Sequence, residues 1–555
     1  MKKTAVLAVF WLMLLQGVSL ADDFFEAQLN SGIRNSDVRA YQVMQEARDD
    51  RPQAVGLLRD AVKYSPDLPA AYFALAKENF SLTSSGVLTT VDYLLAGIDA
   101  YSRNFWWTFS LAGGVFYGLV LSFLLVMLII AAIRCVSDLP LVAHEMGESK
   151  RQSIILLPLF VLSLMSPLLF LAGLLVILGL YMSKIDRVVV YAFLIVLFFS
   201  PVIFRTASLF PDVSSSGRMK AIVTVNESRD NAYALAALKG EDMPAALFSY
   251  ALALKRSGLY HEALSVYQHL VKLHPDARTY VNIGNTYTGM NSLPEALQSY
   301  LAAVTMRPLA SAYYNLSAVS RELLDYEMGN EYYRRAIELD RNAVSRYQNT
   351  AARTPNRIVA DETLSLPELW DLARKSGGRT ATFDLAVLPL WTNALCALLL
   401  AVAFHFLATR ARNRAYRCRK CNSIFCSRCE KHIMWGQMCP QCFRSLIKLD
   451  ETEVKERVAR LLKIYGYQKR RRGILKTLSF TVPGASQIFG GKVLYGFLFM
   501  WPFLFLLILP FTNALMSPGP GMRHWPVDGL SLLLAAMVYV LSNIITRQRI
   551  AKGWL

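Results

Sequence analysis

The chain has 555 residues, of which 54% are hydrophobic and only 18% charged, and this composition is typical of a membrane protein with several domains. The formal net charge is +18, but residues 410–476 alone hold 19 Lys and Arg against 5 Asp and Glu, a local balance of +14. Basic residues crowded beside apolar segments predict a cytoplasmic loop, so binding to nucleic acid is unlikely to be their purpose. Because no GxxxxGK[ST], HExxH or GxSxG motif occurs, we expect no enzymatic activity.

The N-terminal segment has the pattern of an export signal. Two lysines precede the apolar run AVLAVFWLMLL, and small residues around Ala21 offer a cleavage site. Residues 1–21 are therefore predicted to be a signal peptide, with an uncleaved anchor as the alternative. In either case we expect residues 22–105 to be a helical region outside the cytoplasm, and a Gram-negative envelope is the natural setting.

Residues 106–206 are predicted to form a transmembrane region. The stretch 106–133 is long and apolar enough to cross a bilayer. The apolar block 154–182 would be about 43 Å long as one helix, against a hydrocarbon core of about 30 Å, and a Ser-Pro pair at position 166 interrupts it. We expect a re-entrant hairpin that enters and leaves on the cytoplasmic side, which places residues 207–384 outside. A single tilted span is the alternative and would place them inside.

Three aligned units with a period of 33 residues occupy 244–343, between a helical lead-in at 207–243 and a linker at 344–384. The repeated positions are small residues at Ala263 and Ala296, large ones at Tyr267, Tyr300 and Tyr333, turn residues at Gly258 and Asn291, and closing prolines at Pro275 and Pro308. This pattern resembles the tetratricopeptide repeat, in which small residues let paired helices approach. The third unit departs from it at Gly329 and Arg341, as a terminal capping unit would. Residues 22–105 show a weaker form of the same spacing, and two ordinary amphipathic helices are the alternative there.

The repeat resemblance implies an α-solenoid that binds other proteins or peptides on its concave surface. From their repeat positions, the candidate partner-binding residues are Asn282, Asn285, Tyr314 and Asn315. The predicted fold class is all-α: transmembrane helices, helical repeats and a small zinc-knuckle insertion.

A basic cysteine-rich segment covers 409–449. Its cysteines Cys418, Cys421, Cys439 and Cys442 have the spacing C-x2-C-x17-C-x2-C, which predicts two knuckles that close one tetrahedral structural zinc site. The run CRKCNSIFCSRC also resembles the first half of a treble-clef or zinc-ribbon-like finger, so Cys426, Cys429 and His432 are candidate ligands of a second ion. The fourth cysteine pair of such a finger is missing, and His432 is equally an exposed loop residue. A redox role for the pairs would need a strand-helix unit, which the pattern lacks.

Three segments complete the chain. Residues 385–408 are predicted to be a transmembrane helix, and 450–476 an amphipathic charged helix whose basic end lies on anionic lipid. Residues 477–555 resemble a widespread bacterial two-span membrane domain, marked here by VPGASQIFGG. Two plain anchors with a Gly-rich entry are the alternative.

Together these expectations describe a multi-pass inner-membrane scaffold or adaptor. Its N-terminal region and residues 207–384 are periplasmic, and its zinc segment and C-terminus are cytoplasmic. A transmembrane sensor is the alternative function. A transporter subunit has less support, because the predicted spans carry almost no charged residues.

Overall fold

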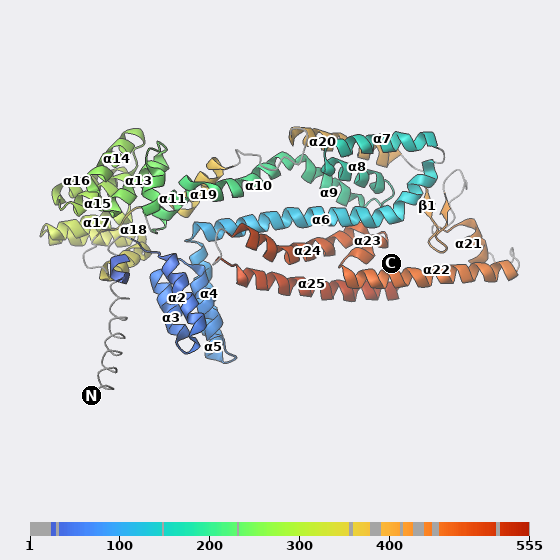
Figure 1. The fold of residues 1–555 in the computed structure, drawn as a ribbon, viewed down its shortest axis with the longest axis horizontal. Helices are drawn as coiled ribbons and strands as arrows, with labels where there is room; N and C mark the ends of the chain where they lie inside the picture. The colour runs from blue at the N-terminus through green and yellow to red at the C-terminus, as the bar shows by residue number, and fades with distance from the viewer. Residues whose placement is uncertain are drawn as a thin grey trace, which may run out of the picture. The chain divides into compact units, whose positions relative to one another are not determined.

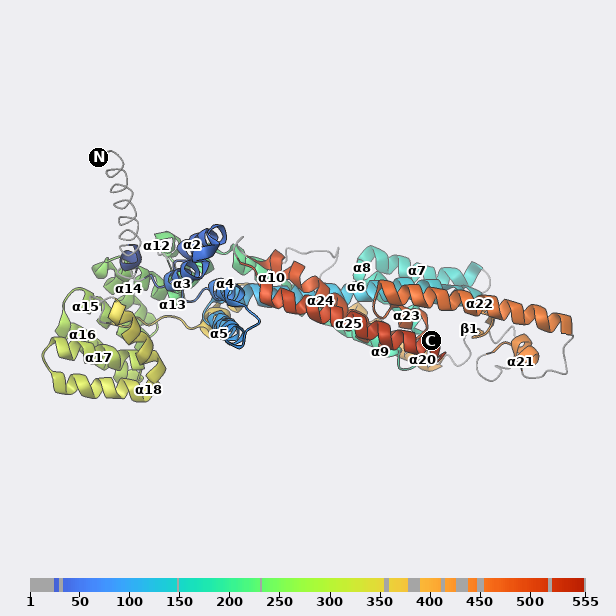
Figure 2. The ribbon, with the colours of Figure 1, turned by 90° about the horizontal axis from the view of Figure 1, so that it is seen from below.

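The computed structural model describes residues 24–28, 33–146, 149–229, 232–353, 359–377, 390–410, 415–425, 438–446, 454–517 and 522–553. These residues are almost entirely helical, with one short two-stranded hairpin, which confirms the all-α fold class. The chain divides into two compact units (Figures 1 and 2). The first comprises residues 1–109, 211–377 and 518–522, and the second comprises 110–210, 378–517 and 523–555.

The N-terminal part of the first unit is a series of short helices that pack one on the next. They are α2 (Asp37–Asp49), the single turn η1 (Arg51–Gln53), α3 (Ala54–Tyr64), α4 (Pro69–Asn79) and α5 (Ser84–Tyr101). Ala54, Leu58 and Ala61, which share one face of α3, are all buried. Because small side chains on that face let helix axes approach closely, the segment forms helix pairs of the kind that its weak repeat spacing indicates.

The predicted repeats are three helix pairs, preceded by α11 (Gly217–Asn226) and α12 (Ala232–Leu238). The pairs are α13 (Pro244–Arg256) with α14 (Tyr260–Leu273), α15 (Ala277–Gly289) with α16 (Leu293–Met306), and α17 (Ala310–Glu322) with α18 (Tyr326–Arg353). Tyr267 and Tyr300 are completely buried at the large position, and the Tyr300 ring fills the space that a β-carbon on Gly284 would need. Gly258 and Asn291 turn the chain with φ of 78° and 60°, a region that favours Gly and Asn.

The residues predicted as a linker, 344–384, are largely helical where the structure describes them. The third unit lacks the closing proline of the earlier units, and α18 continues to Arg353 across a kink at Asp340. A second helix, α19 (Leu366–Ser376), begins at a capping box in which Glu368 reaches back to the Ser365 backbone N–H. That Ser-x-x-Glu signal explains why a helix forms there.

Buried polar contacts join the N-terminal helices to the loop that follows α11. The Asn35 side chain donates to the Glu227 carbonyl at 2.7 Å, and the Asn35 backbone N–H donates to the Ser228 carbonyl at 3.1 Å. Arg229 forms ion pairs with Asp37 on α2 and with Glu227, the latter at 2.9 Å. Segments nearly 200 residues apart in sequence therefore fold as one body.

The second unit contains the apolar helices. They are α6 (Phe105–Met146, which begins in the first unit), α9 (Arg187–Phe198), α10 (Ser200–Ser215), α20 (Leu390–Arg410), α24 (Val493–Met516) and α25 (Trp525–Ala551). Among the described residues, α6, α20, α24 and α25 are each long and apolar enough to cross a membrane. The α9–α10 pair, bent by 60°, meets the same test when taken together. Helices α6, α24 and α25 run side by side (Figures 1 and 2).

Helix α6 continues to Met146, well past residue 133 where the predicted span ends. Arg134 and Asp138 lie one turn apart and form a buried ion pair at 2.5 Å. Arg134 also donates to the Ile488 carbonyl at 3.2 Å. The two charges are thus paired with each other inside the unit, and the helix continues past them to Met146.

The apolar block 154–182 is two helices and not one. Helix α7 (Ser149–Met165) ends at Ser166, and α8 (Pro167–Gly179) packs against it, with Gly173 facing Leu159 and Leu162. At 17 and 13 residues, these helices are about 26 and 20 Å long. Each is shorter than a hydrocarbon core of about 30 Å, which favours the hairpin interpretation over a single tilted span.

The Pro-Gly-x-x-Gln stretch connects four helices. It lies between α22 (Val454–Thr481) and the short α23 (Ala485–Phe489). Gly484 has φ of 88°, and a β-carbon there would collide with the Gly496 carbonyl of α24. Ser486 donates to the Leu475 carbonyl of α22 at 2.7 Å, and Gln487 donates to Thr546 of α25 at 2.6 Å. Gly484, Ser486 and Gln487 therefore pack this stretch against α24, α22 and α25.

Candidate functional site

Four buried sulfur atoms converge in the second unit. Those of Cys418, Cys421, Cys439 and Cys442 all lie within 4.8 Å of one another. The Cys421 and Cys439 sulfurs are 3.7 Å apart, close to the edge of about 3.8 Å that four ligands at about 2.3 Å from a tetrahedral metal would give. The four cysteines predicted from spacing are thus brought close enough together to hold one metal ion.

Two knuckles position these sulfurs. The first forms the turn of the hairpin between β1 (Tyr416–Arg417) and β2 (Ile424–Phe425). Here Asn422 takes φ of 68° and donates its N–H to the Cys418 carbonyl at 2.9 Å. The second lies at the start of α21 (Pro440–Leu446). Its backbone N–H groups point at sulfur: Cys439 N–H toward Cys418 Sγ at 3.3 Å, and Cys442 N–H toward Cys439 Sγ at 3.4 Å.

The protonation of the cysteines follows from this burial. Burial raises the pKa of the Cys439 and Cys442 thiols, and repulsion from nearby sulfurs raises it further, although hydrogen bonds with Cys442 lower the pKa of Cys439. Burial also raises the pKa of Cys421, but hydrogen bonds with Ser423 and with the Cys442 and Cys418 thiols together outweigh it and bring the value to about 7. Several thiolates in so small a volume need a cation to balance their charge, and a divalent metal supplies one. The donor set therefore fits a metal that prefers four thiolates.

Helix α22 completes the cysteine segment, which the sequence pattern did not indicate. Ile464 packs against the four cysteines. Tyr467 donates to the Asn422 side chain at 3.2 Å, and Gln468 donates to the Arg419 carbonyl at 2.9 Å. The helix thus holds the first knuckle through both side-chain and backbone groups.

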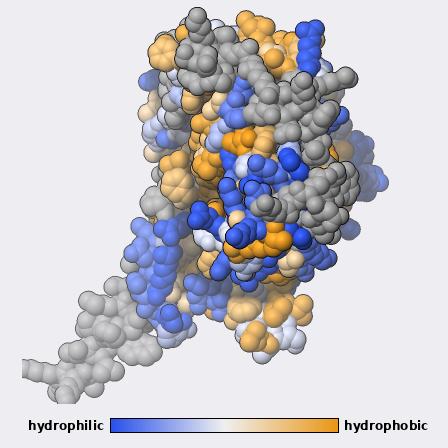
Figure 3. All heavy atoms as spheres, turned by 90° about the vertical axis from the view of Figure 1, so that its right-hand side faces the viewer, coloured by the Kyte–Doolittle hydropathy of each residue, from blue (hydrophilic) through white to orange (hydrophobic). Residues whose placement is uncertain are grey.

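The predicted apolar face of α22 is not covered by other parts of the described chain. The residues predicted to share this face are Val454, Val458, Leu461, Leu462 and Tyr465. Leu461 is 38% exposed, and the other four are each more than half exposed. Figure 3 views the molecule from the side where α21 and α22 lie in Figure 1, and hydrophilic residues occupy the middle of the surface that it shows. The remaining candidate ligands, Cys426, Cys429 and His432, lie outside the described residues.

A second candidate site is the concave side of the repeats, where three of the predicted partner-binding residues lie. Asn282 and Asn285 on α15 and Asn315 on α17 are completely buried. The fourth, Tyr314, is half-buried and packs on Tyr347 with ring centroids 5.3 Å apart. What covers the three asparagines is a part of the same chain, residues 359–364, called the strap below.

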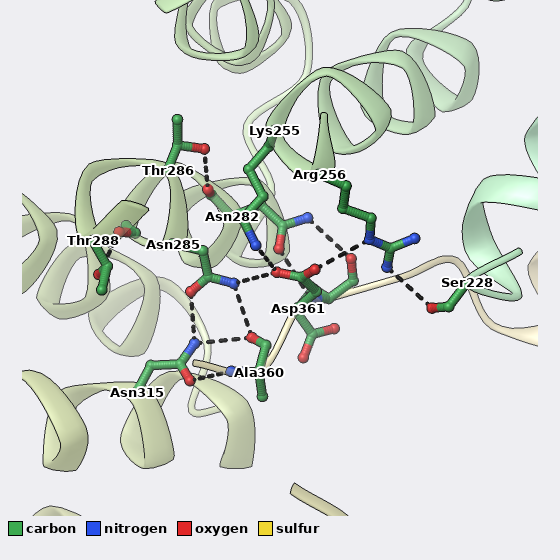
Figure 4. A network of polar contacts seen from close by, with 12 residues as sticks. Ser228, Lys255, Arg256, Asn282, Asn285, Thr286, Thr288, Asn315, Ala360 and Asp361 are labelled. Carbon is green, nitrogen blue, oxygen red and sulfur yellow. Dashed lines mark hydrogen bonds and ion pairs between the residues drawn. The ribbon is translucent and has the colours of Figure 1, made fainter. Parts of the chain in front are cut away.

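The strap is held mainly through its backbone (Figure 4). Asn315 donates to the Ala360 carbonyl at 2.9 Å and accepts from the Ala360 N–H at 2.7 Å. Asn282 does the same for Glu362, at 3.0 and 2.9 Å. The sequence contains no signal for this contact, because backbone groups are common to every residue type.

One strap side chain enters a charged pocket. Asp361 accepts from Lys255 Nζ at 2.5 Å, from Asn285 Nδ2 at 3.0 Å and from Arg256 Nε at 3.3 Å (Figure 4). Arg256 also donates to the Ser228 hydroxyl at 3.1 Å. The site therefore combines recognition of an extended backbone with recognition of one carboxylate.

Comparison with known proteins supports the repeat assignment for part of the chain. The family model described as tetratricopeptide repeat matches residues 277–308 and 310–342, which are the α15–α16 pair and most of the α17–α18 pair. The first predicted unit, α13–α14, has the same helix-pair geometry outside the matched residues. No curated protein matches the chain.

Proposed function

We propose that the protein is a scaffold or adaptor of the bacterial inner membrane that binds partner proteins through its tetratricopeptide-like repeats. The observation that carries the proposal is the concave side of the repeats, where asparagine side chains hold an extended chain by its backbone. Helical-repeat proteins typically use this side to bind peptides. A site that already holds one extended segment has the chemistry to hold others.

The organisation of the first unit supports an orientation. Residues up to 109 and residues 211–377 belong to one body, so the chain between them crosses the membrane an even number of times. Helix α6 and the bent α9–α10 pair provide two crossings if α7 and α8 enter and leave on one side. Met522, between α24 and α25, packs into the same cluster as Trp107. A periplasmic first unit and a cytoplasmic cysteine segment satisfy all of these relations.

The cysteine segment is proposed to hold zinc in a structural role. Four thiolates in a tetrahedral set are the ligands that structural zinc prefers, and such a site folds a segment too small for its own core. The exposed apolar face of α22 and the basic run near Lys469 are proposed to lie on the anionic inner leaflet.

Site-specific photo-crosslinking in intact cells tests partner binding. A photoreactive amino acid at the exposed position Glu322 on α17 or Gln298 on α16 should give adducts with other proteins. The same group at exposed Lys77 on α4 is the control for nonspecific capture. If the repeat positions give no adduct beyond those at Lys77, the scaffold proposal is wrong.

Cysteine accessibility tests the orientation. Lys239→Cys, after α12, should react with an impermeant maleimide in cells whose outer membrane is permeabilised. Lys476→Cys, on α22, should react only after the inner membrane is opened, and the unmodified chain sets the background. Labelling of both positions before that step would contradict the proposed orientation.

A further inference from the structure

The strap passes along the repeats with a two-residue rhythm. Asn315 clamps the Ala360 backbone, and the Ala360 carbonyl also accepts from Asn285 at 2.9 Å. Asn282 clamps the Glu362 backbone, and the Leu364 N–H donates to Asn226 at 2.7 Å. Alternate residues of an extended chain face the same way, so a row of three asparagines contacts every second residue. Because these asparagines bind only backbone groups, they do not select for particular side chains.

The pocket around Asp361, in contrast, does select for a particular side chain. The side chains of Lys255 and Arg256 are only 9% and 2% exposed. Both donate to the Asp361 carboxylate, and loss of a carboxylate from this place would be destabilising because it helps to offset the desolvation of two buried cations. A segment that fills this part of the groove therefore needs a carboxylate between the two clamped residues.

The next position is also polar. Ser311 on α17 donates its hydroxyl to the Glu362 carboxylate. Beside the strap lies a cavity of about 550 Å³ whose lining includes four arginines and, outside the strap, Asp67 and Glu227. Asp67 pairs with Arg34 and Arg103. The preference of the groove for a carboxylate therefore rests on Lys255, Arg256 and Ser311.

We propose that this groove selects an extended acidic peptide, with a small residue at the first clamp, Asp in the pocket and Glu at the second clamp. The strap is the ligand supplied in cis, and a partner protein with a segment of this chemistry binds by displacing it. The inference rests on the proposed function, since it names the kind of partner that the repeats recognise. A partner peptide competes with a tethered ligand, so its apparent affinity is reduced by the fraction of chains in which the groove is open.

The test uses the full-length protein in detergent micelles and a fluorescent peptide with the sequence of residues 359–366, Val-Ala-Asp-Glu-Thr-Leu-Ser-Leu. Asp361→Asn in the protein weakens the strap without altering the groove, so the peptide should bind about tenfold more tightly than to the unmodified chain. Asp371→Asn, which removes an exposed carboxylate from α19, is the matched control and should leave the affinity unchanged. A peptide with Asn in place of its Asp should lose the binding to the Asp361→Asn protein.

Amide hydrogen exchange of the unmodified chain, measured with and without the peptide, tests displacement of the strap without any substitution. The N–H groups of Ala360 and Glu362 are donated to Asn315 and Asn282, so saturating peptide should accelerate exchange in segment 359–364 as the strap leaves. Unchanged exchange together with no peptide binding to a folded Asp361→Asn protein would overturn the inference. A dimer that the peptide dissociates would also overturn it, since the occupant would then come from a second copy. If either of these results overturned the inference while the photoreactive group at Glu322 still gave crosslinks to other proteins, the scaffold proposal would stand.

Discussion

Replacing Arg229 by Met tests whether one buried cation holds the N-terminal helices on the repeats. Its side chain is 16% exposed, and its two anionic partners, Asp37 and Glu227, are 23% and 6% exposed. Methionine keeps much of the volume but leaves two carboxylates without their shared counter-ion. Removing one partner of a buried ion pair costs about 3–5 kcal/mol. For a body of this size that corresponds to a fall in Tm of roughly 6–20 °C.

The loss should depend on pH in a defined direction. Burial raises the pKa of Glu227, although Arg229 and the Phe105 N–H oppose it. Without the guanidinium that pKa rises further, so the folded variant takes up a proton at a higher pH than the unfolded chain does. The folded form is then favoured as pH falls, and the difference in Tm between variant and unmodified protein should be larger at about pH 7.5 than at about pH 5.

The assay is thermal unfolding of the full-length protein in micelles, followed by tryptophan fluorescence, because Trp107 lies in the core of the same unit. Arg335→Met is the control, since Arg335 pairs with Glu331 on the exposed face of α18. The reasoning fails if Arg229→Met melts with the control, or if its loss of stability is the same at both pH values.

Two further predictions concern the second unit. Cys442→Ser should remove one zinc ion per chain, measured by elemental analysis of purified protein, whereas Cys396→Ser in α20 should leave the zinc content unchanged; zinc retained by Cys442→Ser would refute the four-cysteine site. Gly484→Ala places a β-carbon against the Gly496 carbonyl at a residue with positive φ, so it should lower the free energy of unfolding by at least about 2 kcal/mol. Gly473→Ala places a β-carbon in open space on α22, so it should raise the free energy of unfolding by about 0.5–1 kcal/mol. Comparison of their Tm values in micelles checks this pair, and an equal Tm for both would contradict the proposed close approach.

The residues that sequence reasoning placed well are those whose type alone determines their packing. Ala296 and Tyr300 are buried where the repeat pattern puts a small and a large residue. The four cysteines converge as their spacing predicts. In both cases the constraint is local or repeats at a fixed period, so one chain is enough to detect it.

The contacts that were missed depend on pairings far apart in sequence. The strap has no hydrophobic periodicity, and Asn315 binds its backbone groups, which are the same for every residue type. The sequence of the strap therefore does not reveal the contact. Ile464 looks like any other apolar residue of an amphipathic helix until α22 is seen to hold the knuckle. Arg229 and Asp37 are 192 positions apart, and nothing in either neighbourhood predicts that they meet.

The place of Met522 has a consequence for the order of biosynthesis. Its side chain belongs to the cluster that contains Trp107, yet a ribosome reaches it roughly 20–80 s later at ordinary elongation rates. Until the last pair of apolar helices has been inserted, the N-terminal helices must wait beside the nascent chain with one flank of their interior uncovered. Chaperones and proteases would therefore act on this flank, and a chain truncated before Met522 should be degraded faster than the full-length protein.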